Sequence, residues 1–275
     1  MEDELALLEK YNLIKSVGEL KYQTNIIIFT MDYVKEWFKM LDKNYMEKVS
    51  EIISIIKDCL PEVRKIGFRG CNIPDNNLLW SLYTLVIFRG SWTNARSEYD
   101  YSKEKEIYKG TTGFGFGIDH DIDEEQYYSG GMAGRSSSEK GIAFTYGDFS
   151  VLDYSVSKND SKIINDIIKK SKTDREAAIF PVYEESGKNS ELNQVVDILQ
   201  PAIEKMGEIF KESEKESVKI MNSHAPKSAM DNVKPAIYNT LLFKLLGWFG
   251  GAAINSGALK KPGKDEIVQV YGYIE

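Results

Sequence analysis

Residues 113–118 read GFGFGI and residues 141–146 read GIAFTY, and these stretches decide the predicted fold. Across residues 110–154, glycines alternate with aromatic and β-branched residues, a pattern typical of strands joined by glycine-rich turns. We therefore predict strands of an antiparallel sheet here. Glycine inside a strand also marks a place where a ligand or another strand approaches the backbone closely.

Helical spacing of apolar residues dominates the chain before this region. Over residues 30–60 apolar side chains recur at helical spacing, Thr30 suits the N-cap, and Pro61 stands just past the predicted end. Residues 4–13 predict a short amphipathic helix. Residues 75–88 are apolar nearly all round, which is consistent with a buried helix or a buried strand.

The remaining elements follow from the same patterns. Pro201 predicts a kink in a long helix near the C-terminal end of the chain. These predicted elements are helices over 158–172, 191–222 and 229–249, and strands over 65–69, 177–183 and 267–274.

Together the elements predict an α+β fold. A mostly antiparallel central sheet, drawn from residues 65–185 and the C-terminal strand, is flanked by N-terminal and C-terminal helices. With 275 residues the chain fits one large domain or two small ones. We predict a single domain over residues 1–275, made of a helical block (1–62), a glycine-rich β region (63–185) and C-terminal helices with a final strand (186–275).

The composition predicts an acidic cytoplasmic protein. The formal net charge is −7 and the isoelectric point is about 5.2, so the overall field does not attract nucleic acid. Two cysteines, Cys59 and Cys71, suit free thiols in a reducing compartment. The longest apolar stretches, 78–88 and 241–254, are shorter than the roughly 20 residues that cross a bilayer. We therefore expect a soluble chain without a membrane span or a structural disulfide.

A cluster of acidic residues suggests a divalent-cation site. Asp119, Asp121 and Asp123 alternate along the chain, His120 lies among them, and their carboxylates offer the oxygen ligands that Ca²⁺ or Mg²⁺ prefers. The spacing resembles the opening of an EF-hand loop, but glutamate occupies the sixth position and glycine the twelfth. The alternative is a solvated acidic turn between two strands. Because the chain has one other histidine, a multi-histidine zinc site is nearly excluded.

Residues 130–138, GGMAGRSSS, suggest an anion-binding loop. Small residues expose backbone amides, Ser136 and Ser138 offer hydroxyls, and Arg135 is available to face an anion. The alternative is a flexible hairpin loop.

Phe-Arg-Gly at residues 68–70, followed later by three serines at 136–138 and by Phe144, resembles the aromatic-Arg-Gly and Ser-Thr-Ser pattern of mono-ADP-ribosyltransferases. In that family the arginine and the serines hold NAD, so the resemblance implicates Arg69, Ser136 and Ser138. The chain departs from the pattern in three respects. The middle position is serine, a second Phe-Arg-Gly occurs at residues 88–90, and no Glu-x-Glu follows on a later strand. NAD binding is therefore kept as an alternative, and no family is assigned.

Nucleophilic catalysis is a further hypothesis. Cys71 precedes the apolar segment 78–88, and a helix start lowers the pKa of a nearby thiol. His120 or His224 would have to act as the base. A buried, inert thiol is the alternative.

Two classes of function remain. The first is a non-catalytic binding or assembly protein, a subunit of a larger intracellular complex that binds a protein partner or itself. Tyr99, Tyr101 and Tyr108 support this class because tyrosine is favoured at interfaces. The second is an enzyme with a site in residues 110–154 that uses a divalent metal or binds a nucleotide with Arg69. We prefer the first class because the sequence contains no complete catalytic motif.

Overall fold

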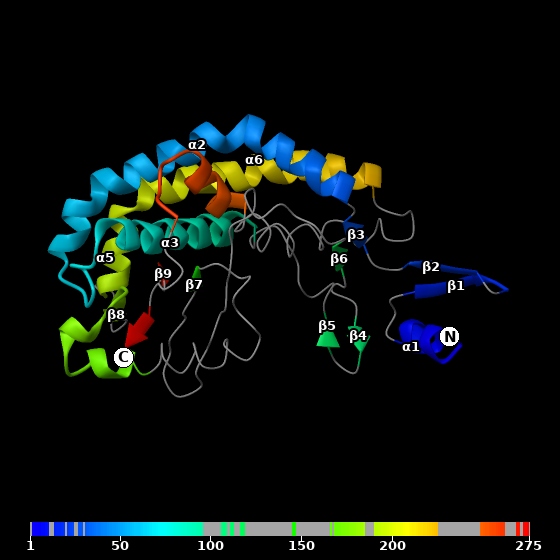
Figure 1. The fold of residues 1–275 in the computed structure, drawn as a ribbon, viewed down its shortest axis with the longest axis horizontal. Coiled ribbons are helices and arrows are strands. Elements are labelled where there is room, and N and C mark those ends of the chain that lie inside the picture. Colours follow the sequence, from blue (N-terminus) through cyan, green and yellow to red (C-terminus); the bar gives the residue numbers. More distant parts are fainter. Residues whose placement is uncertain are drawn as a thin grey trace.

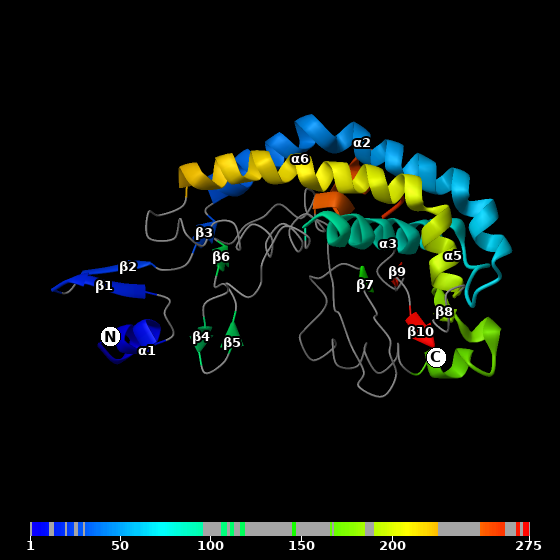
Figure 2. The same cartoon turned by 180° about the vertical axis from the view of Figure 1, so that it is seen from behind.

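Three long helices form the body of the molecule. A computed structural model describes residues 2–10, 14–19, 21–24, 27–29, 31–95, 106–108, 111–112, 116–118, 145–146, 166, 168–184, 190–224, 248–261, 268–269 and 272–274. Within these ranges α2 (Met31–Lys65) and α6 (Gln200–His224) run side by side along the long axis, and α3 (Asp75–Ala95) packs beneath them (Figure 1). The view from behind shows the same layering (Figure 2).

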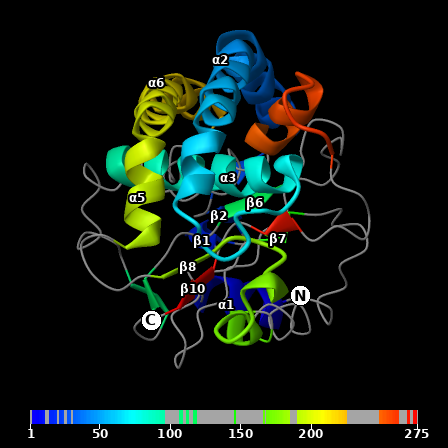
Figure 3. The ribbon, with the colours of Figure 1, turned by 90° about the vertical axis from the view of Figure 1, so that its left-hand side faces the viewer.

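Shorter helical elements lie at the two ends of this body. α5 (Glu191–Ile198) precedes α6, and the view along the long axis shows it leading down from α6 (Figure 3). Residues 248–255 form another helical segment, which contacts α3 through the Tyr83 hydroxyl, a donor to the carbonyl oxygen of Phe249 at 3.1 Å. α1 (Glu2–Lys10) lies at the end of the molecule where α2 begins.

The helices bury the apolar residues that the sequence places at helical spacing. Each fully buried large apolar side chain stabilises the fold by roughly 1.5–3 kcal/mol. Residues 78–88 of α3 are buried on all sides, and the helix confirms the helical alternative for residues 75–88. The buried side chains of the α2 stripe are Trp37, Phe38, Leu41, Tyr45, Val49, Ile52, Ile53 and Ile56. Those of α5, α6 and the residue between them include Leu192, Val195, Leu199, Ile203, Met206 and Phe210.

Helices α3 and α6 approach each other closely at a glycine. A Cβ atom on Gly90 would lie 2.8 Å from Cγ of Met206 and 3.1 Å from the amide nitrogen of Gly207. Two tryptophans join the same bundle by hydrogen bonds: Trp37 Nε1 donates to Ser217 Oγ at 2.8 Å, and Trp248 Nε1 donates to Asp42 Oδ1 at 2.8 Å.

The described strands pair two by two. Three pairs are antiparallel and two are parallel, and the parallel pairs join segments far apart in the chain. The antiparallel pairs are β1 (Ile14–Gly18) with β2 (Lys21–Thr24), β4 (Glu106–Tyr108) with β5 (Thr111–Thr112), and β7 (Thr145–Tyr146) with β9 (Val268–Gln269). The parallel pairs are β3 (Ile27–Phe29) with β6 (Phe116–Ile118), and β8 (Val182–Glu184) with β10 (Gly272–Ile274).

The predicted α+β fold with a mostly antiparallel central sheet is therefore wrong. The described residues are mostly helical, and their apolar side chains are buried between helices rather than on a sheet. The predicted strand over residues 65–69 is the end of α2 followed by a loop, in which Arg69 alone makes a β-bridge, with Val182. The glycine and aromatic alternation of residues 110–154 lies largely outside the described residues.

Two predicted helices have different bounds in the structure, and each difference lies near a proline. Pro61 lies inside α2, one turn before its end, and the helix continues to Lys65 rather than ending at residue 60. The predicted helix over 191–222 is broken at Leu199 into α5 and α6, and Pro201 occupies the first turn of α6, where a missing amide hydrogen costs little. Most of the predicted helix over 229–249 lies outside the described residues.

Candidate functional site

A cavity of about 780 Å³ opens beside the loop that joins α2 to α3. The loop forms one wall, the first turn of α3 adds Asn77, and the 3₁₀ turn Arg175–Ala177 and the two residues after it form the facing wall. The lining residues are Gly67, Phe68, Arg69, Gly70, Cys71, Asn72, Ile73, Pro74, Asn77, Arg175, Glu176, Ala178 and Ile179.

Two glycines shape the loop. Gly67 and Gly70 have φ values of 76° and 78°, a backbone conformation that other residues rarely adopt. Hydrogen bonds from the Cys71 amide to the Phe68 carbonyl (3.1 Å) and from the Ile73 amide to the Gly70 carbonyl (3.3 Å) close two successive turns. Gly70 also packs against the backbone of Phe180, where a Cβ atom would collide with the Phe180 carbonyl oxygen.

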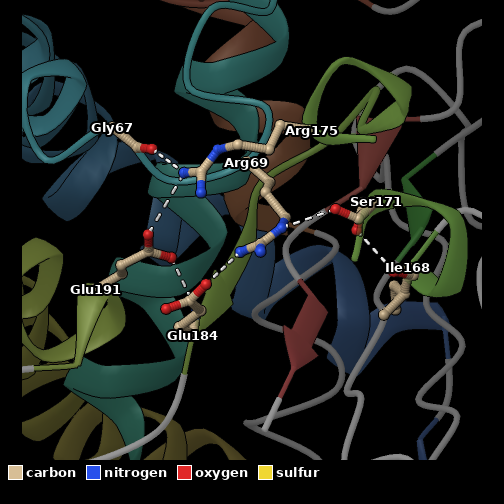
Figure 4. Close-up of polar contacts among 7 residues, drawn as sticks. All are labelled: Gly67, Arg69, Ile168, Ser171, Arg175, Glu184 and Glu191. Carbon is tan, nitrogen blue, oxygen red and sulfur yellow. Dashed lines mark hydrogen bonds and ion pairs between the residues drawn. The ribbon is translucent and has the colours of Figure 1, made fainter. Parts of the chain in front are cut away.

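Arg69 connects the α2–α3 loop to the segments that follow it in space, through hydrogen bonds from its side chain. Its Nε donates to the carbonyl oxygen of Ser171 at 2.8 Å, and its Nη1 donates to Glu184 Oε1 at 2.7 Å (Figure 4). The backbone joins the same elements, because the Val182 amide donates to the Arg69 carbonyl at 2.9 Å. Arg69 is 8% exposed, so its charge is largely removed from water and is compensated by Glu184.

Arg175 and Arg64 hold the loop from two other directions. Arg175 Nη2 donates to the Gly67 carbonyl and lies 3.8 Å from Glu191 Oε1, and Glu191 in turn accepts the Glu184 amide through Oε2 at 2.8 Å (Figure 4). Arg64 Nη1 donates to the Cys71 carbonyl, while its Nη2 donates to the Ile73 carbonyl at 3.0 Å. Guanidinium groups therefore restrain both ends of the loop.

The cavity combines apolar and amide groups. Ile73 is half-buried, Pro74 is exposed, and Ile179 is 51% exposed although it is a large apolar residue. Asn72 and Asn77 add side-chain amides, which both donate and accept hydrogen bonds. The arrangement is chemically suited to an apolar side chain flanked by peptide groups.

Of the residues that the sequence analysis singled out, the structure places Arg69 and Cys71 at the cavity. Arg69 lines the cavity, with its guanidinium bound to Ser171 and Glu184. The predicted partners of Arg69 in the NAD hypothesis, Arg135, Ser136 and Ser138, lie outside the described residues, so that hypothesis stays a prediction.

The predicted metal site also lies outside the described residues, since Asp119, His120, Asp121 and Asp123 all fall in a range that the structure does not describe. Within the described ranges, no three histidine, cysteine, aspartate or glutamate side chains come together as a metal site would require. The calcium or magnesium site stays a prediction.

Sequence reasoning missed the wall opposite the loop. Arg175 and Ile179 are more than 100 positions from Gly67 in the chain, and no local pattern indicates that they meet it. The signal that was available is the pair Gly67 and Gly70 around Phe-Arg, because closely spaced glycines favour a tight loop rather than the strand predicted there.

Comparisons with known proteins assign no family. No protein-family model, curated protein or solved structure matches this chain. In the part of the chain that the structure describes, no helix is long and apolar enough to cross a membrane.

Proposed function

We propose that this protein is a non-catalytic binding protein that holds a short segment of a protein partner in the cavity between the α2–α3 loop and residues 175–179. The observation that carries the proposal is the cavity itself, an opening of about 780 Å³ with the half-exposed Ile179 at its rim. Pockets that bind an anchor side chain of a partner commonly contribute most of the binding energy at an interface.

The open rim favours a peptide segment over an enclosed small molecule. A pocket for a small ligand usually buries 70–90% of the ligand's surface. Six of the thirteen lining residues here are exposed, namely Gly67, Asn72, Pro74, Arg175, Glu176 and Ile179. Such a rim suits an extended chain that places one apolar side chain between Ile73 and Ile179 and directs its peptide groups to Asn72 and Asn77.

The charged groups around the cavity support binding rather than catalysis. Arg69 and Arg175 donate to backbone carbonyls and are paired with Glu184 and Glu191. Groups held in this way fix the shape of the cavity before a partner arrives, and a preformed site lowers the entropic cost of binding.

The proposal places the protein in the cytoplasm as a subunit of a larger complex. Cys59 and Cys71 are both free thiols, which persist in a reducing compartment.

Panning of a displayed random peptide library against the purified chain tests the proposal. We expect enriched peptides to share an apolar anchor, to bind the wild type, and to lose at least about tenfold in affinity, or about 1.4 kcal/mol, for Ile179→Asp. The matched control is Lys211→Asp, a change at an exposed position of α6. Peptides that bind Ile179→Asp as well as the wild type, or a library that yields none, would contradict the proposal.

NAD binding is the alternative, favoured by the position of Arg69 in the cavity lining. A thermal shift with NAD that disappears in Arg69→Met, while peptides fail to bind, would replace the peptide proposal with a nucleotide site.

A further inference from the structure

Strand β8 lies between β10 and the α2–α3 loop. On one edge β10 pairs with β8 in parallel, residue for residue over the length of both strands. On the other edge Val182 forms a β-bridge with Arg69, and the Val182 amide donates to the Arg69 carbonyl at 2.9 Å. Figures 1 and 3 show β8 and β10 side by side. The strand β8 therefore joins β10 to the loop that forms one wall of the cavity.

All three residues of β8 contact the α2–α3 loop. Val182 does so through its backbone. The ring of Tyr183 packs against the ring of Phe68, with their centroids 4.8 Å apart, and Glu184 Oε1 accepts from Arg69 Nη1 at 2.7 Å. Phe68 and Arg69 both line the cavity. Because Val182 and Tyr183 are fully buried in close packing, β8 cannot shift without disturbing these contacts. The position of β8 thus sets the position of the loop.

The backbone of β8 shows how β10 is attached to it. The amides of Val182 and Glu184 donate away from β10, to the loop and to α5. Successive residues of a strand direct their backbone groups to opposite edges, so Tyr183 is the residue of β8 whose amide and carbonyl face β10. In a parallel pair this carbonyl lies opposite the amide of Ile274, one residue beyond the register partner of Tyr183.

The attachment of β10 is short. A parallel pair of three residues contains few hydrogen bonds, and parallel pairing is slightly less stable per residue than antiparallel pairing. Elements held in this way open locally at a lower free energy than the whole fold. The helical body, with its large buried core, stays folded when β10 separates from β8.

We propose that the pairing of β10 with β8 controls the shape of the cavity and, through it, the affinity for the bound peptide. While β10 is paired, β8 holds the loop in the shape that receives the peptide. When β10 leaves β8, the loop loosens and the peptide is released. The described lining of the cavity contains no residue of β10, so this control acts through β8. The effect on affinity rests on the proposed function, whereas the effect on the loop is measurable without a peptide.

Cysteine labelling tests the effect on the loop. Ile274→Pro removes the amide that faces Tyr183, and Ile274→Ala is the matched control because it removes the same side chain and keeps the amide. In a Cys59→Ser chain we expect Ile274→Pro to raise the rate of Cys71 labelling by maleimide at least about fivefold, since Cys71 belongs to the loop. Ile274→Ala should change this rate by less than about twofold. An unchanged rate in Ile274→Pro would overturn the proposal.

Cys59 distinguishes local opening of the loop from a general loss of stability. It lies in α2 and is not among the residues that line the cavity. In a Cys71→Ser chain the rate of Cys59 labelling should be the same for Ile274→Pro and Ile274→Ala. Equal acceleration of both thiols by the proline would show that the whole fold is destabilised, and would overturn control of the cavity by β10.

Peptides enriched by panning against the wild type test the effect on affinity. Their affinity should fall at least about tenfold for Ile274→Pro and stay within about twofold for Ile274→Ala. By linkage, a bound peptide should slow hydrogen exchange of the Ile274 amide in the wild type. Equal binding to both variants would overturn the proposal. A library that yields no peptide would contradict the proposed function instead, and the labelling rates then decide alone whether β10 controls the cavity.

Discussion

Gly70 packs against Phe180 so closely that the space between them holds no side-chain atom. A Cβ atom built on Gly70 collides with the Phe180 carbonyl oxygen and lies 2.8 Å from the carbonyl carbon, and both of these belong to the backbone. The wall formed by residues 175–180 therefore reaches its position only because the loop contributes a glycine at this point.

Substituting Gly70 should cost more stability than the positive φ alone explains, because the new side chain also meets Phe180. We expect Gly70→Ala to lower the free energy of unfolding by about 2–4 kcal/mol, because the methyl group adds a backbone clash to an unfavourable positive φ. Gly67→Ala is the matched control, since Gly67 has a similar φ and no atom within 4 Å of a built Cβ, and it should cost about 1 kcal/mol. Urea unfolding measures the free energy of unfolding of both variants, and equal losses of stability would contradict the close contact between Gly70 and Phe180.

Arg69 should prove important for stability even without a ligand. Arg69→Met removes the donors to Ser171 and Glu184 from a buried position, and we expect a loss of about 2–3 kcal/mol in urea unfolding. Glu184→Gln should cost less than about 1 kcal/mol because the Glu184 side chain is 46% exposed and water replaces part of the pairing. A larger loss for Glu184→Gln than for Arg69→Met would argue against the described arrangement.

Tyr45 should make the fold sensitive to high pH. Burial raises the pKa of Tyr45 to about 12, and the nearby carboxylates of Glu212 and Glu216 add to the increase. Because the folded pKa exceeds the value of about 10 in an unfolded chain, the stabilisation is complete below pH 10 and is lost as the pH rises toward 12. The free energy of unfolding, measured with urea between pH 8 and 11, should fall less steeply with pH for Tyr45→Phe than for the wild type. Parallel curves would contradict this.

The two cysteines should report separately on the cavity. Cys71 lines the cavity, whereas Cys59 lies in α2 with its thiol 3.6 Å from the Ile198 carbonyl oxygen. Burial and the nearby Asp58 raise the pKa of Cys59, which slows its reaction with maleimide at neutral pH. A peptide bound in the cavity should therefore slow the labelling of Cys71 in a Cys59→Ser chain and leave that of Cys59 unchanged in a Cys71→Ser chain. Equal protection of both thiols would place the peptide elsewhere.

Local patterns in the sequence predicted the helices better than the fold. The stripe from Trp37 to Ile56 is decided by residues three or four positions apart, and it is helical in the structure. The segment 75–88 has no such periodicity, so the sequence left a helix and a strand open, and the structure shows a helix. The sheet was wrong because strands are specified by partners far along the chain. β8 pairs with β10 about 90 positions away, and no alternation within either segment reveals that choice.

The candidate site was predictable only in part, for the same reason. Phe-Arg-Gly at residues 68–70 drew attention to Arg69, which does line the cavity. Its contacts with Ser171 and Glu184 depend on how two distant segments pack, and so do those of Arg175 with Gly67. The Gly70 contact with Phe180 is a backbone contact, and the sequence carries no side-chain pattern for it.

The length of α2 sets how far a partner must reach beyond the cavity. Its 35 residues span roughly 50 Å at about 1.5 Å per residue, and the cavity lies beside its C-terminal end. A partner chain anchored in the cavity needs about 15 extended residues to reach the end of the molecule where α2 begins. A short peptide therefore contacts only the cavity and its rim, and a partner that touches both ends of α2 must be longer or folded.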